Sequence, residues 1–269
     1  MSAVAGIAPV VIKIGGRALE DQIREPALWR SILDIHRKHG VILMHGGGAA
    51  VDRQLARLGL VSEKRDGIRI TPPDHMEQIV GVLAGVTNKT LVGAINRESA
   101  SIGISAIGMC LGDGGLARTR VSKRYGFDAG RVGEVESCDD GIAHTLLAAG
   151  YLPVVCSIGL DANGDFLNIN ADDAATGLAS RIRARALVLL TDVPGIKGNT
   201  GLVSEIDHAG IEAMIASGEI SGGMIVKARS AVETAKAIGS PVVILSGQDA
   251  SAIQAWASGN TVGTKVVPR

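Results

Sequence analysis

The chain has 269 residues, of which 46% are hydrophobic, only 2% are aromatic and 36 are glycine, so we expect an aliphatic core with many tight turns, as in α/β proteins. Its 27 basic and 27 acidic side chains give a net charge of zero, which favours neither a nucleic-acid nor a membrane partner. Three widely spaced cysteines without a CxxC pair suggest neither a zinc site nor a disulfide framework, and a reducing cytoplasm is the simplest setting.

The first part of the chain alternates strand and helix patterns. A β-rich apolar run over 9–14 ends in two glycines, and a helix is expected over 26–39. A second buried strand over 41–45 runs into three glycines at 46–48, where another helix opens. This spacing predicts parallel strands joined by right-handed crossovers, and therefore an α/β fold. No apolar run reaches the ~18 residues of a membrane helix, and the N-terminus lacks the basic region of a signal peptide.

The rest of the chain continues this alternation, with hairpins inserted. We expect a hairpin turning at Asp66-Gly67, followed by a long helix to about Arg97 that a capping box of Asp74 and Glu77 would open. The later expected elements are a strand over 102–111, a β-hairpin within 112–136, a helix over 139–149, strands over 152–158 and up to 172, a helix over 173–183, a strand over 187–191, a helix opening at 221–227, and strands over 242–245 and 261–266. A second series of strands and helices begins after Arg185, which is the natural functional division.

Several common motifs are absent or incomplete. The Gly-Lys pair of a Walker A loop does not occur, and the His-Gly-Gly-Gly segment lacks the GxSxG elbow that an α/β-hydrolase would need. Residues 112–117 fit a loose GxGxxA, but an extended segment follows where a dinucleotide-binding fold needs a helix. His36 and His39 have no partner ligands nearby in the sequence and are expected on the surface.

The glycines at 46–48 follow a buried strand and open a helix. Glycine lets backbone N–H groups approach an anion closely, and a helix N-terminus adds partial positive charge. The segment is therefore a candidate anion site, and the alternative is a tight turn without a ligand.

Two lysines stand at positions where a cation needs an explanation. Lys13 ends an apolar strand, so its side chain either faces a cleft or extends to solvent. Lys227 lies in the first turns of a helix, where a cation opposes the helix dipole unless an anion is near; the alternative is a surface lysine.

Two further polar features remain open at this point. Asn168, Asn170 and Asp172 alternate along an extended segment, so they form a polar row at a strand end, or Asp172 caps the next helix. Arg69 lies between two isoleucines on the expected hairpin and could clamp a carboxylate or be solvated.

Seven motifs occur in an order that is similar to that of the acetylglutamate kinases, a group within the amino acid kinase family. The likeness covers about residues 9–267, and although each motif is modest alone, seven in order are highly specific. They are Ile12-Lys13-Ile14-Gly15-Gly16, His45-Gly46-Gly47-Gly48, Asp66-Gly67-Ile68-Arg69-Ile70-Thr71, Leu83-Ala84-Gly85 with Asn88-Lys89, Asn168-Ile169-Asn170-Ala171-Asp172, Thr191-Asp192-Val193-Pro194-Gly195-Ile196 and Gly223-Met224-Ile225-Val226-Lys227.

The resemblance implies a kinase that transfers a phosphoryl group from ATP to the side-chain carboxylate of N-acetyl-L-glutamate, the second step of arginine biosynthesis. It implies an open three-layer αβα sandwich with a central, mainly parallel sheet and β-hairpin excursions. Residues 1–185 would form a lobe for the amino-acid substrate and dimerisation, and residues 186–269 a lobe for ATP. Mg²⁺ would be held mainly by the nucleotide, with no metal ligands expected from the protein.

The same resemblance implies roles for individual residues. Lys13 and Lys227 would stabilise the transferring phosphoryl group, and Asp172 would hold both lysines. The substrate would be bound by Gly47, Gly48, Arg69, Asn168 and Asn170, and the transfer site would be lined by Gly15 and Gly16. The nucleotide would be lined by Asp192, Val193, Pro194, Gly195, Ile196, Lys197, Ser221 and Met224.

One departure from the family concerns its assembly. Arginine-inhibited members carry an N-terminal helix that interlaces dimers into a hexamer, and only about eight residues precede the first expected strand here. We therefore expect a homodimer that is insensitive to arginine. The alternatives are a family member acting on aspartate, glutamate, carbamate or an aminoadipate derivative, a non-catalytic sensor on the same fold, and a dinucleotide-binding oxidoreductase.

Overall fold

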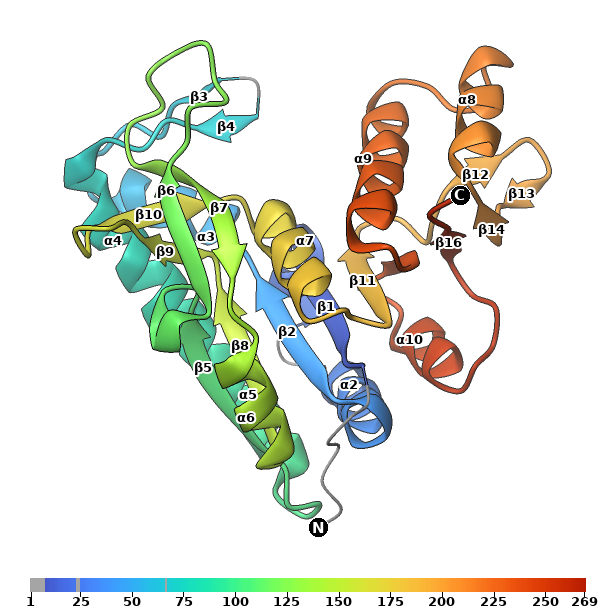
Figure 1. Cartoon of the computed structure of the whole chain (residues 1–269), viewed down its shortest axis with the longest axis horizontal. Coiled ribbons are helices and arrows are strands. Elements are labelled where there is room, and N and C mark those ends of the chain that lie inside the picture. Colours follow the sequence, from blue (N-terminus) through green and yellow to red (C-terminus); the bar gives the residue numbers. More distant parts are fainter. Residues whose placement is uncertain (1–7, 23–24, 66) are drawn as a thin grey trace.

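The centre of the computed structural model, which describes residues 8–22, 25–65 and 67–269, is a sheet of eight strands. Their order is β14-β16-β15-β11-β1-β2-β8-β5 (Figure 1). All neighbours are parallel except β15 and β16, which confirms the mainly parallel sheet. The strands are β1 Val10–Ile14, β2 Val41–His45, β5 Ser105–Cys110, β8 Tyr151–Cys156, β11 Ala186–Thr191, β14 Glu205–Ile206, β15 Val242–Ser246 and β16 Thr264–Val266.

Helices cover both faces of this sheet and complete the expected three layers. One face carries α2 Pro26–His39, α5 Asn88–Ser99 and α10 Ala250–Ala257, and the other carries α6 Gly141–Ala148, α7 Ala171–Arg181 and α9 Gly223–Ile238. Successive side chains of β1 face the two helix layers alternately. Val10 and Ile12 pack with α2, whereas Val11 packs with the α7 side, as the two-residue period of a strand requires.

Smaller elements extend the sandwich, and they include the expected hairpins. A second sheet has the order β6-β7-β10-β9 and lies beside α7 (Figure 1). Asp66, which was expected in the turn between β3 and β4, lies outside the described residues. The remaining elements are α1 Gly16–Gln22, α3 Gly48–Arg57, β3 Lys64–Arg65, β4 Ile68–Arg69, α4 Met76–Val80, β6 Ala117–Val121, β7 Val132–Cys138, β9 Ile158–Leu160, β10 Phe166–Ile169, β12 Lys197–Gly198, β13 Gly201–Leu202 and α8 His208–Ala216.

The long helix expected after the first hairpin is present, but its start differs from the prediction. A 3₁₀ turn at Pro73–His75 leads into α4, a π-helical segment at Gly81–Thr87 and then α5. Because the helical turn already begins at Pro73, Asp74 lies inside it and no side chain caps this end, so the predicted capping box is wrong.

The same helical stretch, Pro73–Ser99, is long and apolar enough to cross a membrane by length and composition alone. However, 44% of its most apolar window is buried, and α5 packs against β5, β8 and α2. It therefore occupies the place of a core helix in the sandwich.

One other expectation from the sequence is wrong. His36 is buried rather than exposed, because the N–H of Val41 donates to its Nδ1 at 3.0 Å where the chain turns from α2 into β2. Burial lowers the pKa of His36 to about 4. The extended segment expected after residues 112–117 is confirmed, because Asp113–Gly115 forms a short 3₁₀ turn that leads into β6 where a dinucleotide-binding loop would need a helix.

Candidate active site

The glycine segments after β1 and β2 meet the first hairpin around a cavity of about 280 Å³. Because β1 and β2 are parallel neighbours, both segments leave the sheet at the same edge. Of the residues expected to act in phosphoryl transfer or to bind the acceptor substrate, only Lys227 does not line this cavity. The others are Lys13, Gly15, Gly16, Gly47, Gly48, Arg69, Asn168, Asn170 and Asp172.

Lys13 faces this cavity rather than solvent. Its ammonium lies 2.9 Å from the Asp172 carboxylate, and its side chain is only 15% exposed. The strand thus delivers a cation to the cavity, and the helix α7 delivers the anion that holds it there. This settles the choice that the sequence left open for Lys13.

Asn170, and not Asp172, caps α7. The Asn170 side-chain oxygen accepts hydrogen bonds from the backbone N–H groups of Asp172 at 2.8 Å and Asp173 at 3.2 Å. An N-cap residue must precede the first helical residue, and α7 begins at Ala171. The Asp172 carboxylate is consequently left free to pair with Lys13.

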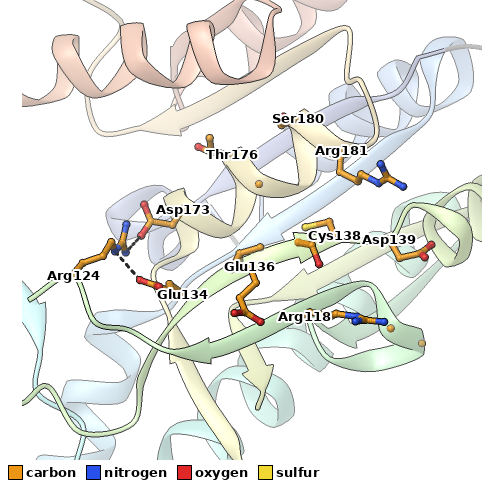
Figure 2. A pocket seen from close by; sticks show the side chains of 15 residues that line it. Arg118, Arg124, Glu134, Glu136, Cys138, Asp139, Asp173, Thr176, Ser180 and Arg181 are labelled. Atoms are coloured by element: carbon orange, nitrogen blue, oxygen red, sulfur yellow. Dashed lines mark hydrogen bonds and ion pairs between the residues drawn. The ribbon is translucent and has the colours of Figure 1, made fainter. Parts of the chain in front are cut away.

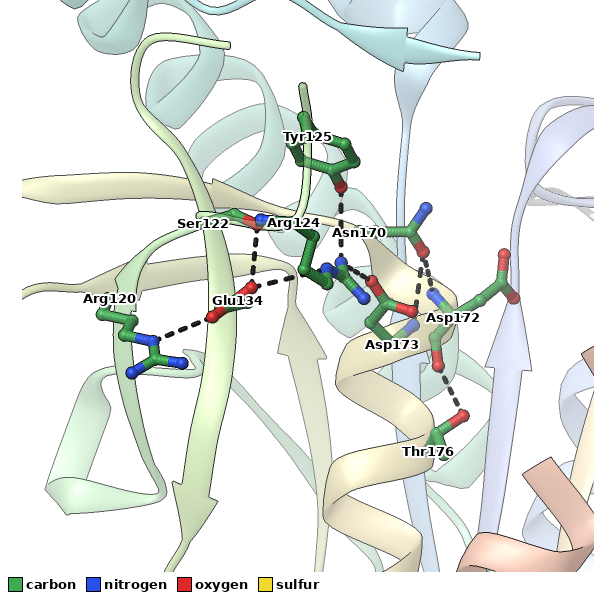
Figure 3. Close-up of polar contacts among 9 residues, drawn as sticks. All are labelled: Arg120, Ser122, Arg124, Tyr125, Glu134, Asn170, Asp172, Asp173 and Thr176. Carbon is green, nitrogen blue, oxygen red and sulfur yellow. Dashed lines mark hydrogen bonds and ion pairs between the residues drawn. The ribbon is translucent and has the colours of Figure 1, made fainter. Parts of the chain in front are cut away.

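A network at the N-terminus of α7 was missed by the sequence analysis. Arg124 lies 3.4 Å from the Glu134 carboxylate on β7 and also donates to Asp173, the neighbour of Asp172 (Figure 3). It therefore ties the second sheet to the end of the helix that presents Asp172. Nothing in the sequence marks Arg124, because its partners lie 10 and 49 residues away in the chain.

Arg69 is held inside the cavity wall, with a side chain only 9% exposed. It donates to Asp52 and Ser62 and, at 2.9 Å, to the backbone oxygen of Gly48. Burial alone would raise the pKa of Asp52, but hydrogen bonds from Arg69, Lys64 and Ser62 outweigh it and hold that pKa well below the usual range. The arginine is thus fixed by an ionised carboxylate, and Asp52 is a second residue that the sequence analysis missed.

Lys227 belongs to a separate group of residues at the start of α9. Its ammonium lies 2.9 Å from Asp192, which directly follows β11, and the two side chains are 46% and 49% exposed. The expectation that Asp172 holds both lysines is therefore not met. The carboxylate next to α9 is that of Asp192, whereas Asp172 is already paired with Lys13.

The backbone of the loop after β11 is held by two threonine hydroxyls, one at the end of β11 and one on β16. The N–H of Val193 donates to Thr191 Oγ1 at 3.2 Å, and the N–H of Ile196 donates to Thr264 Oγ1 at 2.8 Å. The side chain of Ile196 is fully buried, so only its backbone can face a ligand. The other side chains of this group are exposed or half-buried, namely Asp192, Val193, Pro194, Lys197, Ser221 and Met224.

A comparison with known protein families decides what this arrangement belongs to. The model of the amino acid kinase family matches residues 8–246. The chain belongs to the amino acid kinase family.

A named relative and two solved structures resemble the chain over nearly its whole length. An acetylglutamate kinase of Pectobacterium carotovorum subsp. carotovorum (strain PC1) is 40% identical over 263 residues, covering 96% of this chain and 99% of that protein. The crystal structure of smu.665 from Streptococcus mutans UA159 has a TM-score of 0.76 at 25% identity, with 97% and 98% of the two chains covered. Carbamate kinase from Giardia lamblia, with a TM-score of 0.66 at 18% identity and coverage of 98% and 99%, shares the fold.

A wider groove of about 1140 Å³ lies between β7 and α7 of this family member (Figure 2). It is lined by side chains of both signs, including Arg118, Glu136 and Arg181, and by Cys138, whose pKa is raised by burial to about 11. Neither lysine and none of the glycines of the site opens onto it. The smaller cavity, rather than this groove, thus brings together Lys13, Asp172 and the glycine segments.

Proposed function

We propose that the chain transfers the γ-phosphoryl group of ATP to the side-chain carboxylate of N-acetyl-L-glutamate, giving N-acetyl-L-glutamyl 5-phosphate and ADP, the second step of arginine biosynthesis. The observation that carries this proposal is the single cavity that collects Lys13, Asp172, Arg69 and both glycine segments. A relative that is 40% identical over nearly the whole chain is named acetylglutamate kinase, which supports the same substrate.

The chemistry requires positioning and charge neutralisation rather than a base. A carboxylate oxygen of the substrate forms the new bond to the γ-phosphorus while the bond to the bridging oxygen breaks, and that electron pair leaves with ADP. Since the acceptor is already ionised, no proton has to be removed. Lys13 and the backbone N–H groups of Gly15 and Gly47 offset the negative charge on the phosphoryl oxygens and on the attacking carboxylate.

The cavity also has the means to orient the substrate. Arg69 and Asn168 lie on its wall and bind the α-carboxylate end, where the guanidinium can form two parallel hydrogen bonds. Gly47 and Gly48 then bind the side-chain carboxylate. Asp172 does not contact the acceptor in this proposal and instead holds Lys13 in place.

The nucleotide occupies the other lobe, residues 186–269, next to the exposed pair of Lys227 and Asp192. Lys227 leaves Asp192 for the nucleotide phosphates when ATP binds. Among the described residues no group of three or more His, Cys, Asp or Glu side chains could hold a metal ion. Mg²⁺ enters as part of MgATP in this proposal, coordinated mainly by the phosphates.

We propose a cytoplasmic homodimer that pairs along the open edge of the sheet. The strand β5 is an edge strand, and Ile107 on it is 38% exposed while the neighbouring Val86 is 70% exposed. Exposed apolar side chains beside an unpaired strand edge favour pairing with a second copy. Size-exclusion chromatography with light scattering should give twice the 27.6 kDa chain mass, and a hexamer would contradict the proposal.

A coupled ADP-release assay tests the function. We expect activity with N-acetyl-L-glutamate to exceed that with aspartate, glutamate, carbamate and an aminoadipate derivative, and to vanish when EDTA removes Mg²⁺. Addition of arginine should leave the rate unchanged. Equal or greater activity with one of the other acids would assign the chain to a different member of the family.

A further inference from the structure

A buried chain of polar side chains lies behind the second glycine segment, and the mechanism above does not use it. His45 is fully buried and Asn88 is 1% exposed. The Asn88 Nδ2 group donates to His45 Nε2 at 3.0 Å and to the backbone oxygen of Val154 at 2.9 Å. On the other side of the ring, His45 Nδ1 lies 2.8 Å from the backbone oxygen of Gly46.

The orientation of the Asn88 amide is fixed by its neighbours. Lys89 Nζ, which can only donate, lies 3.1 Å from Asn88 Oδ1, and the Val154 oxygen, which can only accept, faces Nδ2. A flipped amide would face both neighbours with the wrong group. His45 Nε2 must therefore accept, and its single proton lies on Nδ1, where it donates to the Gly46 oxygen.

The imidazole stays neutral at physiological pH. Burial is the main cause that lowers the pKa of His45 to about 4; the charge of Lys89 lowers it further, and the hydrogen bond to Gly46 opposes both. A neutral ring with a fixed tautomer has one donor, and that donor is used on the glycine segment.

The bond to the Gly46 oxygen sets the direction of the next N–H group. The described residues contain no cis peptide bond, so the C=O of Gly46 and the N–H of Gly47 point in opposite directions from one planar unit. The N–H of Gly47 thus points away from the His45 ring, and Gly47 lines the cavity. None of the described residues accepts a hydrogen bond from it.

Packing around His45, Asn88 and the second glycine segment leaves little room for other arrangements. A Cβ at Gly108 of β5 would lie 1.9 Å from Asn88 Oδ1, so the strand can pass only without a side chain there. A Cβ at Gly47 would lie 2.8 Å from Leu83 in the π-helical segment. One helical stretch therefore supports the glycine segment twice, through the Leu83 side chain and through Asn88.

We infer that His45 is a positioning residue whose Nδ1–H, held in place by Asn88, aims the N–H of Gly47 at the carboxylate that accepts the phosphoryl group. This inference deepens the proposed function and rests on it for the identity of the acceptor. The residue does not touch the substrate and acts through the peptide unit between Gly46 and Gly47.

Two amide substitutions separate positioning from packing. His45→Asn keeps a donor at the place of Nδ1 and loses the contact with Asn88, whereas His45→Gln keeps a group at the place of Nε2 and loses the donor. We expect kcat with N-acetyl-L-glutamate to fall about 10²-fold in H45Q but to stay within about 5-fold of the wild type in H45N. The KM for ATP should be unchanged in both, because the nucleotide residues lie in the other lobe.

Losses of kcat that are equal in the two variants, or larger in H45N, would overturn the inference, since a histidine that only fills space is better replaced by the longer glutamine. Thermal unfolding of both variants shows whether their stabilities are comparable.

A second experiment uses the wild-type enzyme and so does not depend on the folding of a variant. In ¹⁵N NMR of the imidazoles, we expect His45 as the Nδ1–H tautomer and His36, which accepts through Nδ1, as the Nε2–H tautomer. An Nε2–H tautomer at His45 would overturn the inference. Failure of the proposed function would appear separately, as absence of ADP release with N-acetyl-L-glutamate in the wild type.

Discussion

The proposed acceptor side and the proposed nucleotide side of this enzyme differ in how firmly the protein alone holds their charged side chains. On the acceptor side, the side chains of Lys13 and Arg69 are 15% and 9% exposed and both are ion-paired. On the nucleotide side, Lys227 and Asp192 are 46% and 49% exposed. The charged side chains of the proposed acceptor side are thus largely buried and held by the protein, whereas those of the proposed nucleotide side remain about half exposed.

Part of this difference follows from the elements that carry each group. Lys13 stands at the end of the central strand β1 and Asp172 at the capped start of α7, whereas Arg69 lies on the two-residue strand β4 and is held by its ion pair with Asp52. Asp192 lies on the loop after β11, and Lys227 lies on α9 with its side chain exposed. Four predictions test this contrast, from the largest expected effect to the smallest.

Removal of either lysine should cause the largest loss. We expect Lys13→Ala and Lys227→Ala each to lower kcat by about 10²–10³, because each removes a cation that meets the phosphoryl group in the proposed transition state. Steady-state kinetics with both substrates measures this. If either variant turned over at a near-wild-type rate, the role given to that lysine would be wrong.

Replacement of the Arg69 guanidinium by an ammonium group should mainly affect binding of the acid. Arg69→Lys keeps the charge but loses the planar fork, so we expect the KM for N-acetyl-L-glutamate to rise roughly 10-fold with little change in the KM for ATP. Arg30→Lys on the exposed face of α2 is the matched control. An increase confined to the KM for ATP would contradict the proposal that Arg69 binds the acid.

The Asp52 carboxylate should make the acceptor side sensitive to acid. Its pKa is lowered in the folded state, so it stabilises the fold at pH values above its usual 3.8, and this contribution is lost as the pH falls. Asp52→Asn should therefore reduce the free energy of unfolding at pH 7, and the difference from the wild type should shrink below about pH 4. Chemical denaturation across pH measures it. Asp74→Asn, at an exposed position without an ion pair among the described residues, is the control variant.

The exposed pair on the nucleotide side should contribute least to stability. Asp192→Asn removes the partner of Lys227, and surface ion pairs of this kind contribute less than about 1 kcal/mol. We expect almost no change in thermal unfolding and a modest change in the KM for ATP. A large loss of stability would show that this side is as firmly built as the acceptor side, and the contrast would fail.

Much of the fold could be predicted because its signals are local. The helix at Pro26–His39, the strands β1, β2 and β11 and the glycine segments follow from apolar periodicity and from glycine positions. The capping of α7 and the burial of His36 could not be predicted. Asn170 and Asp172 both suit a helix N-terminus, and His36 is buried by the turn into β2 and by tertiary packing that its own segment does not reveal.

The sequence by itself determined which residue types were available for phosphoryl transfer. Glycine segments after buried strands can bind anions through backbone N–H groups, and lysines at strand and helix ends supply positive charge, whatever their tertiary contacts. Only the tertiary structure decided their partners. Asp172 pairs with Lys13 and Asp192 with Lys227, and Asn88 reaches His45 across 43 residues of chain. Such pairings depend on which strands become neighbours in the sheet, and that is settled by burial of the whole core rather than by any local pattern.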